Sequence, residues 1–421
     1  MHNLMTKRHF ERYVEMKNKN DIKQIVFMYL IFLGSLLAFL GAQGTGDHKY
    51  FFEWVNNVDT YGLIEGFKMN QNCYPPLATL ILYIFNRVFS FIPGSALFAI
   101  RFSTLLAMMI SCIIVQLIFR NVNLCYILFF SLIFSVTNGY LDILMLPLGL
   151  ISYYMICKEK YFLFGLFLSL ACLIKFQPLI ILPIIAVGYF EFEWKEYVHV
   201  KWKNGIKTMT GGVIPVLLMF LVYGKPFLYS IMSSMSTVFE YLSPNGLNVG
   251  WIIQSIYEIV TGSMDDNKFV IMNAEPCRAL VLFKYVFWII YLCIFIKILL
   301  TKSRTRLDII KGCLVVYTAY YLFNTNVHEN HFFIGVILAF LMYAEAKDLY
   351  QIMIFATYMF NINLLVFYGI WGTTNGFNRV ICGKIDPTLY LACVNVILGI
   401  YIILMMFRTI GSDKRIEEYN L

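Results

Sequence analysis

Apolar runs recur along the chain from about residue 25 to residue 407, and short polar segments separate them. A helix needs about 20 mainly apolar residues to cross the hydrocarbon core of a bilayer, so repeated runs of this kind predict membrane spans. The composition agrees, because 60% of the residues are hydrophobic and 14% are charged, against about 45–50% and about 25% in soluble domains. A soluble globular chain and a disordered chain are both excluded, and we expect an all-α polytopic membrane protein.

The distribution of positive charge predicts how the spans are oriented. Cytoplasmic segments of membrane proteins are enriched in Lys and Arg. Most of the 33 Lys and Arg residues fall on one side if the run at 76–92 enters the membrane without crossing it. We then expect twelve spans, a re-entrant segment after the first span, and both termini in the cytoplasm. The apolar runs lie near 25–42, 76–92, 96–119, 123–138, 141–157, 161–176, 178–190, 210–223, 279–300, 308–323, 333–345, 349–368 and 389–407.

This orientation divides the chain into three regions. Residues 1–24 form a basic cytoplasmic N-terminus, residues 25–407 form a single transmembrane domain, and residues 408–421 form a cytoplasmic tail. The outer face then carries the loop 43–75, where a catalytic site would lie. Ionisable groups at membrane depth are costly and tend to mark sites, so charged residues at this face are the first candidates.

Several common chemistries lack their motifs. The sequence has no GxxxxGK[ST] loop for nucleotide phosphates. Its ten cysteines show no paired metal-ligand spacing. The basic residues are spread as membrane anchors, so nucleic acid is not expected as a partner.

The loop 43–75 presents Asp47 just outside the first span, after the flexible residue Gly44. From 50 to 67 the pattern is amphipathic, which predicts a helix that lies in the membrane interface. Asp47 is either a general base held at the bilayer surface or a solvated loop carboxylate. The apolar positions at helical spacing are Phe51, Val55, Val58 and Tyr61.

Two further charges lie at the ends of apolar runs. Asp142 is the only acidic residue between Glu65 and Glu159, and it is either a helix cap or a member of a site with Asp47. Lys175 lies among apolar residues and must either reach the membrane surface or meet an anion such as a phosphate.

The turn at 324–332 holds three titratable residues within four positions: His328, Glu329 and His331. Their spacing differs from the zinc-protease pattern, which places two histidines four residues apart on a helix. A divalent metal is therefore possible at this turn, but no known metal-binding spacing indicates one. Phosphate contact, orientation of an acceptor and plain interfacial polarity all remain open. Arg278 begins the next span from the outer side and could meet a lipid phosphate.

The order of these features resembles the GT-C superfamily of membrane glycosyltransferases, which use polyprenyl-phosphate sugars as donors. Asp47 with Tyr74-Pro-Pro-Leu is similar to the family's catalytic Asp and re-entrant segment. Gly139-Tyr-Leu-Asp142 is similar to its second acidic turn, although many members have Gln where Tyr140 stands. The remaining similar segments are Ile174-Lys-Phe-Gln-Pro178, Val327-His-Glu-Asn-His331 and Ser243-Pro-Asn-Gly-Leu-Asn248.

The resemblance implies a GT-C-like fold with an interfacial helix and an active site on the periplasmic face of a bacterial inner membrane. The size is nearest to O-antigen glucosyltransferases of serotype conversion in lipopolysaccharide biosynthesis. These take glucose from undecaprenyl-phosphate glucose, so the implied partners are this lipid donor, a lipid-linked glycan acceptor, a flippase and a donor synthase. No nucleotide cofactor is implied.

The implied mechanism is inverting. Asp47 would deprotonate the acceptor hydroxyl, while Lys175, Arg278 and His331 would stabilise the leaving phosphate. Asp142, His328 and Glu329 would bind or orient the substrates. The alternatives are a transporter or flippase for a lipid-linked sugar, an O-antigen polymerase and, less well supported, a membrane acyltransferase. The sequence shows no internal repeat of the kind that transporters often have.

Overall fold

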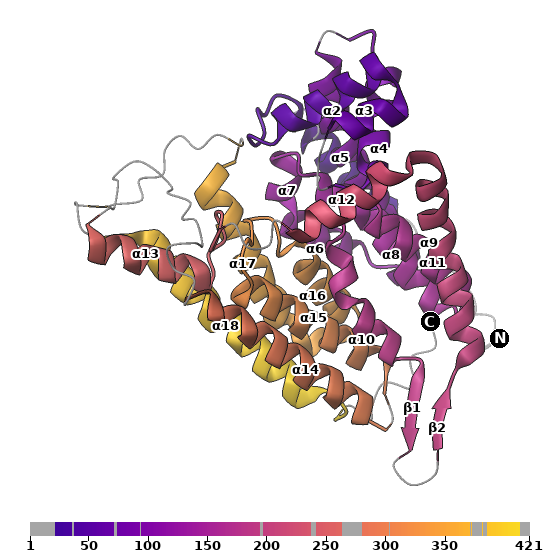
Figure 1. The fold of residues 1–421 in the computed structure, drawn as a ribbon, viewed down its shortest axis with the longest axis vertical. Coiled ribbons are helices and arrows are strands. Elements are labelled where there is room, and N and C mark those ends of the chain that lie inside the picture. Colours follow the sequence, from indigo (N-terminus) through magenta and orange to yellow (C-terminus); the bar gives the residue numbers. More distant parts are fainter. Residues whose placement is uncertain are drawn as a thin grey trace, which may run out of the picture.

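The computed structural model describes residues 22–35, 38–70, 74–92, 94–193, 197–236, 241–262, 280–302, 304–370, 372, 381 and 385–412. These residues are mainly helical, and the helices pack as one body (Figure 1). The two short helices α2 and α3 lie at one end of this body, and a β-hairpin lies at the other. The protein is a membrane-embedded helical protein, as the composition predicted.

The first half of the chain begins with a helix at Ile22–Leu40. The elements that follow it are α2 (His48–Tyr61), α3 (Leu63–Met69), α4 (Pro76–Val88), α5 (Ser95–Phe119), α6 (Val122–Ser131), α7 (Ile133–Thr137), η1 (Leu141–Met145), α8 (Leu146–Cys157), α9 (Tyr161–Cys172), η2 (Gln177–Ile181) and α10 (Leu182–Val187).

A hairpin then leads into the second half. It consists of β1 (Phe190–Glu193) and β2 (Tyr197–Val200), which pair antiparallel. The helices that follow are α11 (Trp202–Tyr223), α12 (Lys225–Ser236), α13 (Val249–Thr261), η5 (Leu280–Phe283), α14 (Lys284–Leu300), α15 (Arg306–Phe323), α16 (Phe333–Glu345), η6 (Lys347–Leu349), α17 (Tyr350–Tyr368) and α18 (Pro387–Thr409).

Five of the described helices are long and apolar enough to cross a bilayer: Ile22–Leu40, Ser95–Phe119, Trp202–Tyr223, Lys347–Tyr368 and Pro387–Thr409. Several other predicted spans correspond to shorter apolar helices, because 3₁₀ turns and chain breaks interrupt them. The run at 141–157, for example, is split between η1 and α8. The total of twelve spans therefore stays a prediction.

The amphipathic segment after the first span forms two helices. Gly62, with a φ of 81°, separates α2 from α3. Three of the predicted apolar positions, Phe51, Val55 and Val58, are buried, whereas Tyr61 is exposed. The buried face of α2 packs against α4 and α5, so the segment is attached to the helical body along its apolar side.

The next segment, α4, begins at Pro76, where proline suits the first turn of a helix. Its 13 residues extend about 20 Å at 1.5 Å per residue, which is shorter than the roughly 30 Å of hydrocarbon. This length fits the prediction of a segment that does not cross, and the crossing itself stays a prediction.

The core lies around α15 and α16, whose residues are buried on nearly every side. Small residues allow other helices to cross closely. A Cβ atom on Gly165 would lie 2.0 Å from the Thr208 carbonyl oxygen, and one on Gly211 would lie 2.0 Å from that of Phe162. This crossing fixes α9 against α11, as small residues do in membrane helix packing.

Candidate functional site

Three turns far apart in the sequence meet through Asp142. Lys175 Nζ donates to Asp142 Oδ1 at 2.7 Å, and Asn330 Nδ2 donates to Asp142 Oδ2 at 2.9 Å. Asp142 lies in η1, Lys175 follows the end of α9, and Asn330 lies between α15 and α16. The predicted candidates Asp142 and Lys175 therefore belong to one cluster with the turn that carries His328 and Glu329.

The surroundings of Lys175 decide between the two interpretations of its charge. The residue is only 8% exposed, so its side chain is enclosed by the protein. Its ammonium group pairs with Asp142 and lies 5.5 Å from the centroid of the Tyr74 ring. Tyr74 belongs to the Tyr-Pro-Pro-Leu segment, which thus lies beside this buried cation.

Asp47 lies at the N-terminus of α2 and is half-buried. Its side chain makes no capping hydrogen bond to that helix. Burial raises the pKa of Asp47, the positive charge of Lys175 opposes the rise, and the negative charge of Asp142 adds to it. Asp47 is therefore a carboxylate within electrostatic range of the Lys175–Asp142 pair, partly open to solvent and raised in basicity.

Glu329 faces the same cluster. Tyr140 donates its hydroxyl to Glu329 Oε1 at 2.5 Å, and Asn363 Nδ2 donates to the Glu329 carbonyl oxygen at 2.7 Å. The other carboxylate oxygen, Oε2, is buried and has no hydrogen-bond partner among the described residues. Burial, followed by the negative charge of Asp47, raises the pKa of Glu329 to about 8. This carboxyl group can hold a proton near neutral pH.

The two histidines of the turn lie side by side, with ring centroids 5.0 Å apart. Burial and then the positive charge of Lys175 lower the pKa of His328 to about 4. Burial, His328 and Lys175 lower the pKa of His331 well below its usual value. Both lowered pKa values favour the neutral ring, and the expected role of His331 toward a phosphate stays a prediction. Its Nδ1 lies 3.3 Å from the Tyr320 hydroxyl.

Arg101 is a residue that the sequence analysis missed. It is fully buried in α5 and donates from Nη2 to the Ala42 carbonyl oxygen at 2.8 Å, and from Nη1 to the Thr137 carbonyl oxygen. These bonds join the segment before Asp47 to the turn before Asp142. A charge inside the apolar run 96–119 was the signal that could have identified it.

His48 was also missed. Its ring is buried, and its Nε2 lies 3.4 Å from the Gly139 carbonyl oxygen. Burial and the charge of Arg101 lower the pKa of His48 to about 4. His48 therefore packs between the two turns as a neutral ring, directly after Asp47 in the chain.

The segment Ser243-Pro-Asn-Gly-Leu-Asn248 is connected by hydrogen bonds to the turn that carries His328 and His331. The Leu247 N–H donates to Asn363 Oδ1 at 2.9 Å, and Asn363 also binds the Glu329 backbone. Asn248 Nδ2 donates to the Tyr321 carbonyl oxygen at 3.0 Å. The similar segments at 243–248 and 327–331 are thus in contact through α17, which carries Asn363.

Arg278 lies outside the described residues, so its place relative to the cluster stays a prediction. Among the residues described, no group of three or more His, Cys, Asp and Glu side chains is arranged to hold a metal ion. The cluster of Asp47, Asp142, Lys175, His328, Glu329 and His331 offers three elements of group-transfer chemistry. These are a half-exposed carboxylate, a buried cation and a carboxyl group that can carry a proton.

Comparison of the chain with protein-family models and with curated proteins finds no match. Function is therefore inferred from the site, because a helical membrane architecture is compatible with many activities.

Proposed function

We propose that the protein is an inverting membrane glycosyltransferase. It would move a hexose, glucose by the resemblance, from a polyprenyl-phosphate sugar to a lipid-linked O-antigen or another surface glycan. The observation that carries the proposal is the position of Asp47, a half-buried carboxylate within electrostatic range of the buried pair of Lys175 and Asp142. A base beside a buried cation, in a membrane-embedded protein, suits attack on a sugar whose leaving group is a lipid phosphate.

Asp47 is the proposed general base. It removes the proton from the acceptor hydroxyl, which attacks the anomeric carbon as the carbon–oxygen bond to the phosphate breaks. A raised pKa brings a carboxylate closer to the working pH and makes it a better proton acceptor. Because one displacement takes place, the configuration at the anomeric carbon inverts.

Lys175 is the proposed partner of the leaving phosphate. A preorganised cation in a site of low dielectric stabilises negative charge that develops in the transition state. Asp142 holds the Lys175 side chain in place, and Asn330 in turn holds Asp142. His331, as a neutral ring, would add a hydrogen bond to the phosphate. Arg278 is proposed as a second cation for the same phosphate.

Glu329 is the proposed group that orients a sugar hydroxyl. Tyr140 fixes one of its oxygens, while the other is buried and has no partner among the described residues. A carboxyl oxygen in this state can bind a hydroxyl that enters the site. His328 belongs to the same turn, lies within electrostatic range of Lys175 and would contribute to the same surface.

The proposed topology places this cluster at the periplasmic face of a bacterial inner membrane. Twelve spans, cytoplasmic termini, the α2–α3 pair in the interface and a re-entrant α4 are parts of the same proposal. The short length of α4 and the amphipathic face of α2 support it.

The test is transfer by the purified full chain from synthetic undecaprenyl-phosphate glucose to a lipid-linked glycan, followed by mass spectrometry. Asp47→Asn should lower turnover by about 10²–10⁴-fold, the usual contribution of a general base. Glu53→Gln is the matched control, because Glu53 is an exposed carboxylate on the same helix. Wild-type turnover in Asp47→Asn would remove Asp47 from the role. Movement of the labelled lipid across the bilayer without a glycoside product would favour a flippase.

A further inference from the structure

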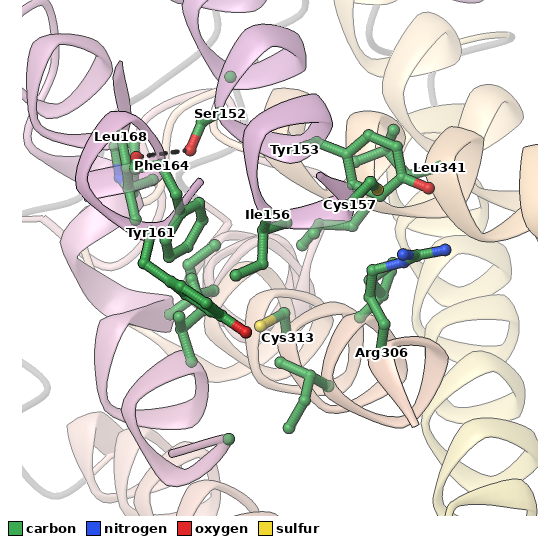
Figure 2. A pocket seen from close by; sticks show the side chains of 18 of the residues that line it. Ser152, Tyr153, Ile156, Cys157, Tyr161, Phe164, Leu168, Arg306, Cys313 and Leu341 are labelled. Carbon is green, nitrogen blue, oxygen red and sulfur yellow. Dashed lines mark hydrogen bonds between the residues drawn. The ribbon is translucent and has the colours of Figure 1, made fainter. Parts of the chain in front are cut away.

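A cavity extends from the element that carries Asp142, since Met145 of η1 is among its lining residues. Its volume is about 390 Å³, within the range of about 300–1,000 Å³ that is common for small-molecule sites. Helices α8, α9, α10, α15 and α16 surround it, and the first turn of α11 closes part of its edge. In Figure 2, Ile156 of α8, Tyr161 of α9 and Cys313 of α15 converge on this space.

We call the end of the cavity that lies beside the β-hairpin its opening, and the hairpin is at the end of the molecule opposite α2 and α3 (Figure 1). Tyr189 directly precedes β1 and Lys201 directly follows β2, and both line the cavity. The rings of Tyr161 and Tyr189 lie 6.2 Å apart. Because α8 and α9 each extend about 18 Å from this end, the opening is separated from Asp142 and Lys175 by the length of these helices.

The interior of the cavity is apolar. Apolar side chains form its walls, and they include Phe164, Leu168, Ile181, Ile334 and Leu341. Such walls favour a hydrocarbon chain over a polar solute, because burying polar groups without partners is costly. Two of the lining residues, Met145 and Pro178, are three positions in the sequence from Asp142 and Lys175, respectively.

The edge of the cavity is basic. Lys201, Arg304 and Arg306 line it, together with one acidic residue, Glu159. Arg306 is partly neutralised, since its Nε donates to Glu345 Oε1 at 2.7 Å. Arg304 donates from Nη1 to the Val187 carbonyl oxygen at 2.8 Å, which fixes its guanidinium beside the opening. Lys158 and Lys160 flank Glu159 in the sequence and add to the positive charge of this end.

We propose that this cavity binds an anionic glycerophospholipid. One acyl chain would occupy the apolar interior, and the phosphate group would lie against Arg304 and Lys201. The pairing of an apolar chamber with a basic edge fits a molecule with a hydrocarbon tail and a negative head. The proposal depends on membrane embedding and not on glycosyl transfer, so the two proposals can fail separately.

The experiment measures lipid retained by the full chain. The protein is purified in detergent, incubated with mixed micelles that contain equal phosphatidylglycerol and phosphatidylcholine of the same acyl length, and analysed by native mass spectrometry. We expect phosphatidylglycerol to be retained in preference to phosphatidylcholine. Equal retention of the two lipids would overturn the proposal, because it would indicate a non-specific lipid belt.

Two variants locate the site. Lys201→Gln should weaken phosphatidylglycerol retention by about fivefold, since a basic residue near a lipid surface contributes about 1 kcal/mol. Lys203→Gln removes the same charge from an exposed position two residues further along the chain, which does not line the cavity, and it should have no effect. Equal losses in the two variants would place the lipid elsewhere.

Gly149→Leu tests the hydrocarbon chamber. Gly149 lines the cavity, and a Cβ atom built on it meets no atom within 4 Å, so the new side chain enters free space. This variant should lose most of the retained phosphatidylglycerol while its monodispersity is unchanged, and unchanged retention would contradict an acyl chain in the cavity. If the variant does not fold, the comparison of Lys201→Gln with Lys203→Gln tests the proposal instead.

Inorganic phosphate at the same concentration as the lipid should not displace phosphatidylglycerol from the protein. Displacement would show that the head group alone is bound and would contradict an acyl chain in the cavity.

Discussion

Lys175 Nζ lies 2.7 Å from Asp142 Oδ1, and Asp142 is completely buried while Lys175 is nearly so. Removing one member of a buried ion pair leaves the other charge without compensation, whereas replacing both by apolar groups is often nearly neutral. The pair therefore offers a way to separate stability from function in the proposed site.

Lys175→Met should destabilise the protein by about 3–5 kcal/mol, the usual cost of leaving a buried charge unpaired. The double variant Lys175→Met/Asp142→Leu should regain most of that stability, because no buried charge remains. Glucosyl transfer should stay lost in both variants, since the cation for the phosphate is absent. Thermal unfolding in detergent and the transfer assay measure the two effects, and an active double variant would show that Lys175 serves stability alone.

Glu329 predicts a dependence of stability on pH. Its pKa rises from 4.5 to about 8 on folding, so between these values the unfolded chain loses its proton while the folded chain retains it. Stability should therefore fall as the pH rises from about 4.5 to about 8, by an amount on the order of a few kcal/mol. Glu329→Gln should remove this decrease. Melting temperatures across that pH range measure the decrease. The same dependence of melting temperature on pH in the wild type and in Glu329→Gln would be evidence against the raised pKa of Glu329.

The sequence predicted those features whose signal is local. The spacing of Phe51, Val55 and Val58 correctly identified the buried face of α2, because helical periodicity lies within one segment. It did not predict the break at Gly62, where the chain adopts a φ of 81°. It also did not predict the hairpin of β1 and β2, although Phe190 and Phe192 alternate with Glu191 and Glu193 in the pattern of a strand.

The contacts within the site depend on the tertiary fold, and the sequence could name candidates without pairing them. Asp142 and Lys175 are 33 positions apart, and Tyr140 and Glu329 are 189 apart. Asn363 had no signal at all, because an Asn in an apolar run does not show which turn it will bind. The turn preferences of single residues contain no information about such distant partners.

His328 predicts an opposite dependence on pH. Its pKa falls from 6.5 to about 4 on folding, so the unfolded chain gains a proton in this range before the folded chain does. Stability should therefore fall as the pH is lowered from about 6.5 to about 4. His328→Gln should lessen this acid-side loss, whereas Glu329→Gln should leave it in place. Melting temperatures between about pH 6.5 and pH 4 measure this loss. The same decrease in His328→Gln and in the wild type would contradict the prediction.

Gly139, in the turn before Asp142, lies against His48, the residue that follows Asp47. The φ of Gly139 is 68°, and a Cβ atom there would lie 2.6 Å from His48 Nε2 and 3.1 Å from Arg101 Nη1. Gly139→Ala should therefore destabilise the protein through both the left-handed conformation and a steric clash. It should also lower glucosyl transfer, because displacing His48 moves Asp47 relative to the Lys175–Asp142 pair.

Gly94 provides the matched control for this substitution. It has a φ of 74°, and a Cβ atom there would meet no atom within 4 Å. Gly94→Ala should therefore cost only the left-handed conformation, about 1–2 kcal/mol, and should leave transfer unchanged. Melting temperatures and transfer rates of the two variants measure the difference. Equal losses of stability in both would show that His48 and Arg101 move aside freely, and that Gly139 does not fix the geometry of the site.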